Sequence, residues 1–455
     1  MAISESRVAG SVVATGIALQ IPSTRRSRLL RSVVLAAVSK LTAVAVHLIA
    51  LPIALSTLGT ERYGVFLSLQ SSFGWFGLAG LGLSVILPRF LSATDVSGNR
   101  GEERNLVLSA LTIMLGAGAA VAFLMLIVGA AISPARLLGL PRGLVPAGLG
   151  IAFVAGVLAC SSRSVAAIDA AVRGGYQELH RVYALTTIAN VCFAVLLMWV
   201  FRTHGSIWSL FAMMYGPFVF LSFADFLVLL FVQRRHLASG SWHFASTAAK
   251  LLPNGLNAVL KQTSYFLMTS GATVMVLHLE GVRKVSAFGT LMALLVLLSS
   301  GFGAFCQPLL SAMANAHSHG DRHWFRKAYF AGLGLTLVAA GLFVVVAAAA
   351  GPWLCVKWLH ADLAITRTLC TAMAVYFLFW MLSDYHFFIL ASMARLERLG
   401  KFYLLEGACA LLCATALAPA YGIDGFAVGL AVGTACFSAI FLPLRAWKMI
   451  DRQGW

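Results

Sequence analysis

The stretch from Leu51 to Ala93 reads LPIALSTLGTERYGVFLSLQSSFGWFGLAGLGLSVILPRFLSA, and its pattern recurs along the chain. Two long apolar runs, within residues 32–57 and 64–88, flank the short break GTER at residues 59–62. A helix needs about 20 mostly apolar residues to cross about 30 Å of hydrocarbon. The stretch therefore predicts two membrane-spanning helices joined by a short turn.

The composition excludes a water-soluble protein. Of the 455 residues, 60% are hydrophobic and only 11% are charged, whereas soluble domains average about 25% charged residues. Apolar runs between charged or turn-rich breaks extend the opening pattern to about twelve spans. These spans lie near residues 32–57, 64–88, 106–132, 144–170, 182–201, 207–232, 251–278, 285–311, 328–350, 363–391, 402–420 and 425–444. We therefore predict an all-α, polytopic membrane protein.

The placement of positive charge predicts the orientation. The chain has 33 Lys and Arg against 16 Asp and Glu, which gives a net charge of +17. Cytoplasmic loops hold the excess of Lys and Arg in membrane proteins. With the N-terminus inside, 22 of the basic residues fall on cytoplasmic segments and 8 on outer segments. Both termini are therefore predicted to be cytoplasmic, and the basic excess reflects topology rather than a nucleic-acid surface.

Two short similarities at nearly the same spacing predict an internal repeat. The run LPRFLSA ends the second span and QPLLSA ends the eighth, which pairs Pro88 with Pro308. VSKLT in the first span matches VLKQT in the seventh, which pairs Lys40 with Lys261 in the same register to within a single residue. Because six spans separate the members of each pair, both copies have the same orientation. We expect two six-helix bundles around a central cleft, related by a pseudo-two-fold axis along the membrane normal. The expected division is a cytoplasmic tail 1–30, bundles 31–232 and 251–447, a cytoplasmic linker 233–250 and a C-terminal tail 448–455.

Three basic residues, Lys40, Arg163 and Lys261, lie within predicted spans. An ionisable side chain in the bilayer costs about 2.5–3.5 kcal/mol on insertion scales and usually faces a bundle interior or a water-filled cavity. Lys40 and Lys261 each lie about ten residues into a span, or about 15 Å deep. The repeat places them on opposite walls of the cleft, where two ammonium groups suit a diphosphate and Arg163 adds a third cation. The alternative is that each lysine extends along its flexible stem to the interface.

Other polar residues within the spans are weaker candidates. Some share a helical face with a lysine or with Asp384, and others are isolated acids. The cleft-lining candidates are His47, Asn254, Asn257, Ser264, Tyr376 and Trp380, and the candidates for coupling to a proton or Na⁺ are Asp384, Asp225 and Glu406. The competing interpretations are a packed residue for His47 and a packed aromatic core with a satisfied acid around Asp384. Asp169 and Arg173, which are one helical turn apart, predict a structural ion pair.

Several kinds of function lack their sequence signature. The eight cysteines show no CxxC spacing, so we interpret them as packing residues and expect no disulfide framework or metal site. There is no GxxxxGKS/T loop for an intrinsic ATP-driven pump. No large loop is available to present catalytic groups, as a membrane glycosyltransferase or ligase would need. We expect a protein that is not an enzyme and has no cofactor.

The stretch from Leu51 to Ala93 also resembles a known family. Its Leu-Gly-x-x-x-Tyr-Gly element, Leu58 to Gly64, and the arginine-rich loop after it are similar to the polysaccharide-export flippases of the Wzx type. These belong to the multidrug/oligosaccharidyl-lipid/polysaccharide exporter superfamily. The resemblance covers about residues 30–130 and the twelve-span plan. It implies a bacterial inner-membrane protein whose cationic cavity receives a lipid diphosphate.

Two functions follow as hypotheses. The first is a flippase that moves an undecaprenyl-diphosphate-linked oligosaccharide across the membrane by alternating access, for surface polysaccharide assembly. Its partners would be this lipid-linked glycan, membrane lipids, and a polysaccharide polymerase with export machinery. The alternative is a multidrug or small-cation exporter on the same scaffold. The sign of the charge in the cleft distinguishes the two, because an exporter of cations needs acidic groups there.

Overall fold

A computed structural model describes residues 23–452 except 81, 98, 177, 203–205, 239–241, 319, 362 and 393–398. Positions 1–22 of the expected N-terminal tail and positions 453–455 of the expected C-terminal tail therefore lie outside the described residues. Within the described ranges every regular element is helical, which confirms the predicted all-α class.

The helices of the two halves have the following bounds. The first half comprises α1 (Ser23–Ser72), η1 (Phe73–Gly80), α2 (Leu83–Ser97), α3 (Arg100–Ile132), α4 (Pro134–Leu137), η2 (Arg142–Leu144), α5 (Leu149–Gly175), α6 (Leu179–Arg202) and α7 (Ile207–Ala238). The second comprises α8 (Phe244–Phe266), η3 (Leu267–Gly271), α9 (Ala272–Glu280), α10 (Val282–Ser318), α11 (Arg322–Leu359), α12 (Arg367–Ser392), α13 (Leu399–Ala435), η4 (Cys436–Phe441) and α14 (Leu442–Arg452). The predicted linker 233–250 is mostly helical, because α7 and α8 both extend into it.

The described residues form twelve membrane passes, as predicted. Nine segments within them are long and apolar enough to cross a membrane. Two of these segments, 34–76 and 399–448, contain a turn at Gly59 (φ 73°) and at Gly422 (φ 59°) and so make two passes each. Glycine has no Cβ and adopts this positive φ without steric cost. The series α8, η3 and α9 supplies the remaining pass.

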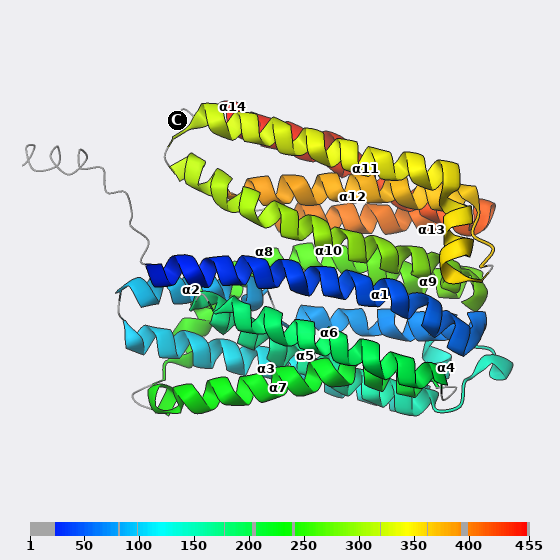
Figure 1. Ribbon diagram of the computed structural model, residues 1–455, viewed down its shortest axis with the longest axis horizontal. Helices are drawn as coiled ribbons and strands as arrows, with labels where there is room; N and C mark the ends of the chain where they lie inside the picture. The colour runs from blue at the N-terminus through cyan, green and yellow to red at the C-terminus, as the bar shows by residue number, and fades with distance from the viewer. Residues whose placement is uncertain are drawn as a thin grey trace, which may run out of the picture.

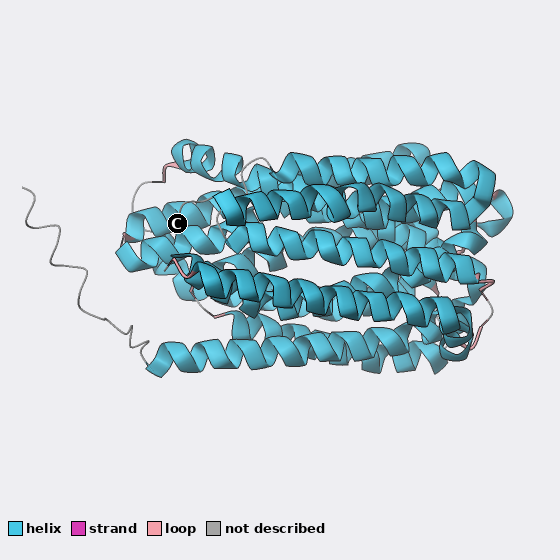
Figure 2. Cartoon of the chain, turned by 90° about the horizontal axis from the view of Figure 1, so that it is seen from above, coloured by secondary structure: helices cyan, strands magenta, loops and turns pink. Residues whose placement is uncertain are grey.

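The passes are arranged as two lobes. Helices α1–α7 form the N-lobe and α8–α14 form the C-lobe (Figure 1). The helices run roughly along the long axis of the molecule (Figures 1 and 2). The start of α1 and the last helix, α14, lie at the same end, as an even number of passes requires (Figure 1). We call this end the terminal end, and we call the end with Gly59 and Gly422 the distal end.

The internal repeat is visible in the backbone at the distal end. Gly59 has φ 73° and ψ 164°, and Gly281, at the equivalent position of the second half, has φ 82° and ψ 176°. Each glycine separates one pass from the next in its half. Phe66 and Phe288 follow their glycines at the same distance along the chain and are both buried, at 5% and 0% exposure. The two halves therefore share a turn of the same geometry at the same position.

One irregular helical turn accounts for the difference in spacing between the lysine pair and the glycine pair. The spacing between Gly59 and Gly281 is one residue longer than that between Lys40 and Lys261, so the second half holds one extra residue between these points. That interval contains η3, a π-helical turn. A π turn closes its hydrogen bond over five residues instead of four and can absorb one extra residue. The lysine pair and the glycine pair thus fit one continuous repeat.

Candidate functional site

Lys261 and Asp384 form an ion pair between α8 and α12. Lys261 Nζ lies 3.1 Å from Asp384 Oδ1, and the two side chains are 22% and 24% exposed. The ammonium group also lies 3.3 Å from the centroid of the Phe387 ring and 5.5 Å from that of Tyr403, which is within cation–π range. The sequence interpretation treated Lys261 and Asp384 as separate candidates. In the structure they pair with each other, so the charge of Lys261 is balanced within its own lobe.

Glu406 of α13 lies behind this ion pair and is only 2% exposed. Ser383 Oγ donates a 2.8 Å hydrogen bond to Glu406 Oε2, whereas Glu406 Oε1 has no hydrogen-bond partner among the described residues. A buried carboxyl group with one unpaired oxygen is suited to hold a proton or a small cation. We call Lys261, Ser383, Asp384 and Glu406 the C-lobe cluster.

The polar face predicted for the seventh span packs largely against α13. Ser264 is 2% exposed, and a Cβ on Gly407 would lie 2.6 Å from its Oγ. Asn257 contacts Gly400 in the same way, with its Oδ1 3.0 Å from the position of a Cβ there. Ser264 therefore packs against α13 instead of lining an open cleft, because the glycines of α13 let α8 approach closely. Asn257 contacts α13 but is only half-buried, so its place in the cleft stays a prediction. Asn254 lies in α8, but its side chain is outside the described residues.

The aromatic candidates of the tenth span are core residues. Tyr376 is fully buried and Trp380 is 5% exposed, with their ring centroids 5.8 Å apart. The Tyr376 hydroxyl donates to the Met268 carbonyl oxygen at 3.3 Å. The half-buried Tyr265 packs against Trp380 with 5.5 Å between the ring centroids. Sequence reasoning missed Tyr265, which packs against this core.

His47 is also a packing residue in the structure. Its Nδ1 lies 2.8 Å from the Ala43 carbonyl oxygen, one turn earlier in α1. Its ring lies 6.2 Å from that of Phe193 in α6. Both contacts are within the N-lobe, so the structure favours the packing interpretation over a ligand contact.

Asp225 belongs to a buried ion-pair network in the N-lobe. The Arg173 side chain is 1% exposed and contacts Asp169 at 3.0 Å, Asp225 at 2.7 Å and Glu178 at 3.3 Å. The predicted pair of Asp169 and Arg173 is thus confirmed. Asp225, on α7, also pairs with Arg173 of α5. This contact links the two helices and gives Asp225 a structural role. Because Asp225 and Arg173 are 52 residues apart, no local sequence pattern reveals their contact.

Lys40 and Arg163 are the two remaining cations within the spans. Lys40 is half-buried on α1, and Arg163 is exposed on α5. Across the described parts of the chain, neither cation forms an ion pair.

The repeat reveals an asymmetry of charge between the lobes. Arg163 and Asp384 are separated by the same spacing that relates Lys40 to Lys261, so they occupy equivalent positions. A serine comes immediately before each of Arg163 and Asp384, and most buried positions of α5 and α12 coincide at this spacing. The C-lobe thus has a lysine and an acid where the N-lobe has a lysine and an arginine.

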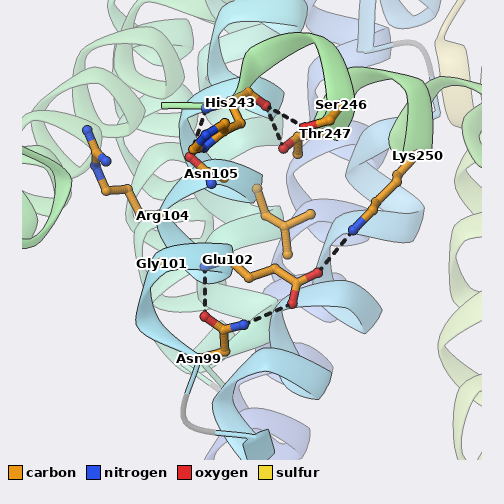
Figure 3. Close-up of a pocket in the computed structure, with 10 residues that line it drawn as sticks. Asn99, Gly101, Glu102, Arg104, Asn105, His243, Ser246, Thr247 and Lys250 are labelled. Atoms are coloured by element: carbon orange, nitrogen blue, oxygen red, sulfur yellow. Dashed lines mark hydrogen bonds and ion pairs between the residues drawn. The ribbon is translucent and has the colours of Figure 1, made fainter. Parts of the chain in front are cut away.

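A separate polar cavity of about 520 Å³ lies at the terminal end, between the starts of α3 and α8 (Figure 3). Lys250 Nζ points at Glu102 Oε1 across 3.5 Å, and the His243 backbone N–H donates to Asn105 Oδ1 at 3.3 Å. These contacts attach the beginning of the C-lobe to α3. Among the residues that the structure describes, no group of three or more His, Cys, Asp or Glu could hold a metal ion.

Comparison with solved structures identifies the fold. An inward-facing multidrug resistance MATE family transporter of the MOP superfamily superposes with a TM-score of 0.73 at 13% identity, covering 92% of this chain and all of that chain. An outward-facing multidrug resistance MATE family transporter of the MOP superfamily gives 0.66 at 14% identity, covering 94% and 97%. A MOP superfamily transporter from Pyrococcus furiosus, described as having a binding pocket of reverse polarity that suggests a different function, gives 0.68 at 13% identity, covering 94% and 97%.

The chain therefore has the two-lobe fold of the MATE transporters in the MOP superfamily, the fold that the resemblance at Leu51 to Ala93 implied. No protein-family model and no curated protein matches its sequence.

Proposed function

We propose that this protein is an alternating-access membrane transporter whose substrate occupies the space between the two lobes. The fold supports this, because the solved proteins that share it are described as transporters in inward-facing and outward-facing conformations. The proposed function includes no chemical change of the substrate, and the proposed location is the bacterial inner membrane with both termini in the cytoplasm.

Two substrates remain candidates, and different observations favour each. Multidrug export has the better support from the comparisons, because the solved structures of the same fold include proteins described as multidrug transporters. A lipid-linked glycan is favoured by charge. Lys40 and Arg163 carry two positive charges in the N-lobe, whereas Lys261 is balanced by Asp384. That asymmetry is the main observation in favour of an anionic substrate, because a cationic drug gains nothing from an unpaired cation.

On the anionic interpretation, the substrate is an undecaprenyl-diphosphate-linked oligosaccharide. Lys40 and Arg163 hold its diphosphate, and Lys261 joins them when it leaves Asp384. The C-lobe cluster is then the proposed site of coupling, since Glu406 keeps one unpaired buried oxygen among the described residues. Asp225 is no longer proposed for coupling, because Arg173 is its partner. A polysaccharide polymerase and export machinery remain the expected partners.

Binding to the purified protein separates the two substrates. The double variant Lys40→Ala/Arg163→Ala should lose most of its affinity for an isoprenyl diphosphate in nanodiscs, while binding of a cationic dye is unchanged or stronger. Arg181→Ala, which removes an exposed arginine that pairs with Glu178, is the matched control and should bind like the parent. If the parent binds the dye but not the diphosphate, and Asp384→Asn abolishes dye binding, the multidrug interpretation is correct.

A further inference from the structure

The lobes meet at the distal end in a contact that follows the pseudo-two-fold axis. The spacing that relates Gly59 to Gly281 also makes Thr60 equivalent to Val282 and Gly64 equivalent to Ser286. Ser286 Oγ donates a 2.5 Å hydrogen bond to the Thr60 carbonyl oxygen. In the reciprocal contact, a Cβ on Gly64 would collide with the Val282 carbonyl oxygen. Each half therefore presents the same surface to the other, as in a two-fold symmetric dimer.

Residues on the axis contact their own equivalents. Glu61 and Arg283 are equivalent at this spacing, and Arg283 Nε donates to Glu61 Oε1 at 2.9 Å. Two turns further, Leu67 lies against Gly289, its equivalent, with 2.9 Å between the leucine Cδ1 and the position of a Cβ. The charged pair is the one opposite-charge contact among these equivalents, so it both attracts the lobes and fixes their alignment.

We propose that this contact, formed by residues 60–67 and 282–289, is the seal that closes the distal end of the cleft and separates when the cleft opens there. We call it the distal seal. The proposal rests on the proposed function, since only an alternating-access transporter needs to open this end. The seal is suited to reversible opening because it combines small residues and an exposed ion pair, with Arg283 80% and Glu61 38% exposed. Such a pair contributes little and breaks readily.

Gly64 provides the sharpest test of the seal. Its helical backbone accepts alanine, but the added methyl group would meet the backbone oxygen of Val282, which cannot rotate away. Gly289→Ala is the matched control, because its methyl group meets only the flexible end of Leu67. The reporter is Thr290→Cys, a fully buried position one turn beyond Ser286. Its reaction with a hydrophilic maleimide in nanodiscs is measured against the same protein without this cysteine.

Opening of the seal should expose the reporter. We expect Gly64→Ala to raise its labelling rate about ten-fold or more, as overpacking against fixed atoms does, and Gly289→Ala to leave the rate within about two-fold of the parent. Glu61→Gln should raise the rate about two- to five-fold, the value of a surface ion pair. The exchanged pair Glu61→Arg/Arg283→Glu should return it to the parental rate.

A parental labelling rate in Gly64→Ala would overturn the seal, as would a parental rate in Glu61→Gln. If Gly64→Ala does not fold, Glu61→Gln and the exchanged pair decide the question alone. Labelling needs no substrate, so the two proposals can fail separately. If the protein labels as expected but transports neither candidate substrate, the result would support the seal and contradict the proposed function.

Discussion

Replacing Asp384 by asparagine removes the negative partner of Lys261 and keeps the shape of the side chain. In the parent, the ammonium group lies between the Asp384 carboxylate at 3.1 Å and the Phe387 ring at 3.3 Å. An anionic substrate that uses Lys261 must first compete with that carboxylate. In Asp384→Asn the lysine keeps its aromatic neighbour but is free to pair with the substrate, so an isoprenyl diphosphate should bind more tightly.

The geometry sets the size of this effect. Unit charges 3.1 Å apart attract by about 5 kcal/mol at an effective dielectric constant of about 20. Desolvation opposes much of this attraction, and side chains that remain about a quarter exposed lie between surface pairs and fully buried ones. A net contribution of about 1–2 kcal/mol is therefore expected. This corresponds to about a five- to thirty-fold gain in affinity.

The assay is equilibrium binding of an isoprenyl diphosphate to the purified protein in nanodiscs at fixed salt concentration. Asp225→Asn is the matched control, because it also neutralises an acid within the spans but one that pairs with Arg173. It should leave the affinity unchanged. Unchanged or weaker diphosphate binding in Asp384→Asn would refute the idea that Asp384 competes with the substrate. Loss of cationic dye binding in the same variant would assign the acid to a drug site.

Three further outcomes are expected. Arg173→Ala should lower the free energy of unfolding by about 3–5 kcal/mol, because it leaves buried carboxylates without a partner. Arg181→Ala, which removes a side chain that is 54% exposed, should cost less than about 1 kcal/mol. Thermal denaturation in detergent measures both, and equal stability of the two variants would contradict the prediction. Gly429→Ala should destabilise by about 1–3 kcal/mol, because its methyl group would collide with backbone atoms of the preceding pass, while Gly334→Ala, with nothing within 4 Å, should be neutral or slightly stabilising. Glu406→Gln keeps the buried volume and should fold normally. If this carboxyl group is the coupling site, transport by the variant should no longer depend on a proton or Na⁺ gradient. Transport that still depends on the gradient would show that Glu406 is not the coupling site.

The sequence was most informative where the signal is local. Each pass is a run of about 20 apolar residues, so twelve spans were predictable without any contact between them. The ion pair of Asp169 and Arg173 was predictable for the same reason, since residues one turn apart on a helix are neighbours. The repeat was detectable from two short matches because both halves retained a residue at the same depth.

The contacts of the charged side chains were not predictable. Lys261 and Asp384 lie on helices that are far apart in sequence, and the periodicity of α8 shows a polar face without showing what covers it. The structure covers much of that face with α13, because Gly400 and Gly407 allow the two helices to approach. Hydropathy does not distinguish a polar face that lines a cleft from one that packs against a glycine-rich helix.

The sequence by itself thus determined the number of passes and the repeat, because the hydrophobic thickness of the bilayer acts on each segment separately. Only the tertiary structure decided which charges are balanced, because an ion pair depends on distances between helices that are far apart in the chain. Lys40 and Lys261 are equivalent in the repeat, yet Lys261 is paired with Asp384 and Lys40 forms no ion pair within the described residues. The different residues at the equivalent positions, Arg163 and Asp384, are the physical reason for that difference.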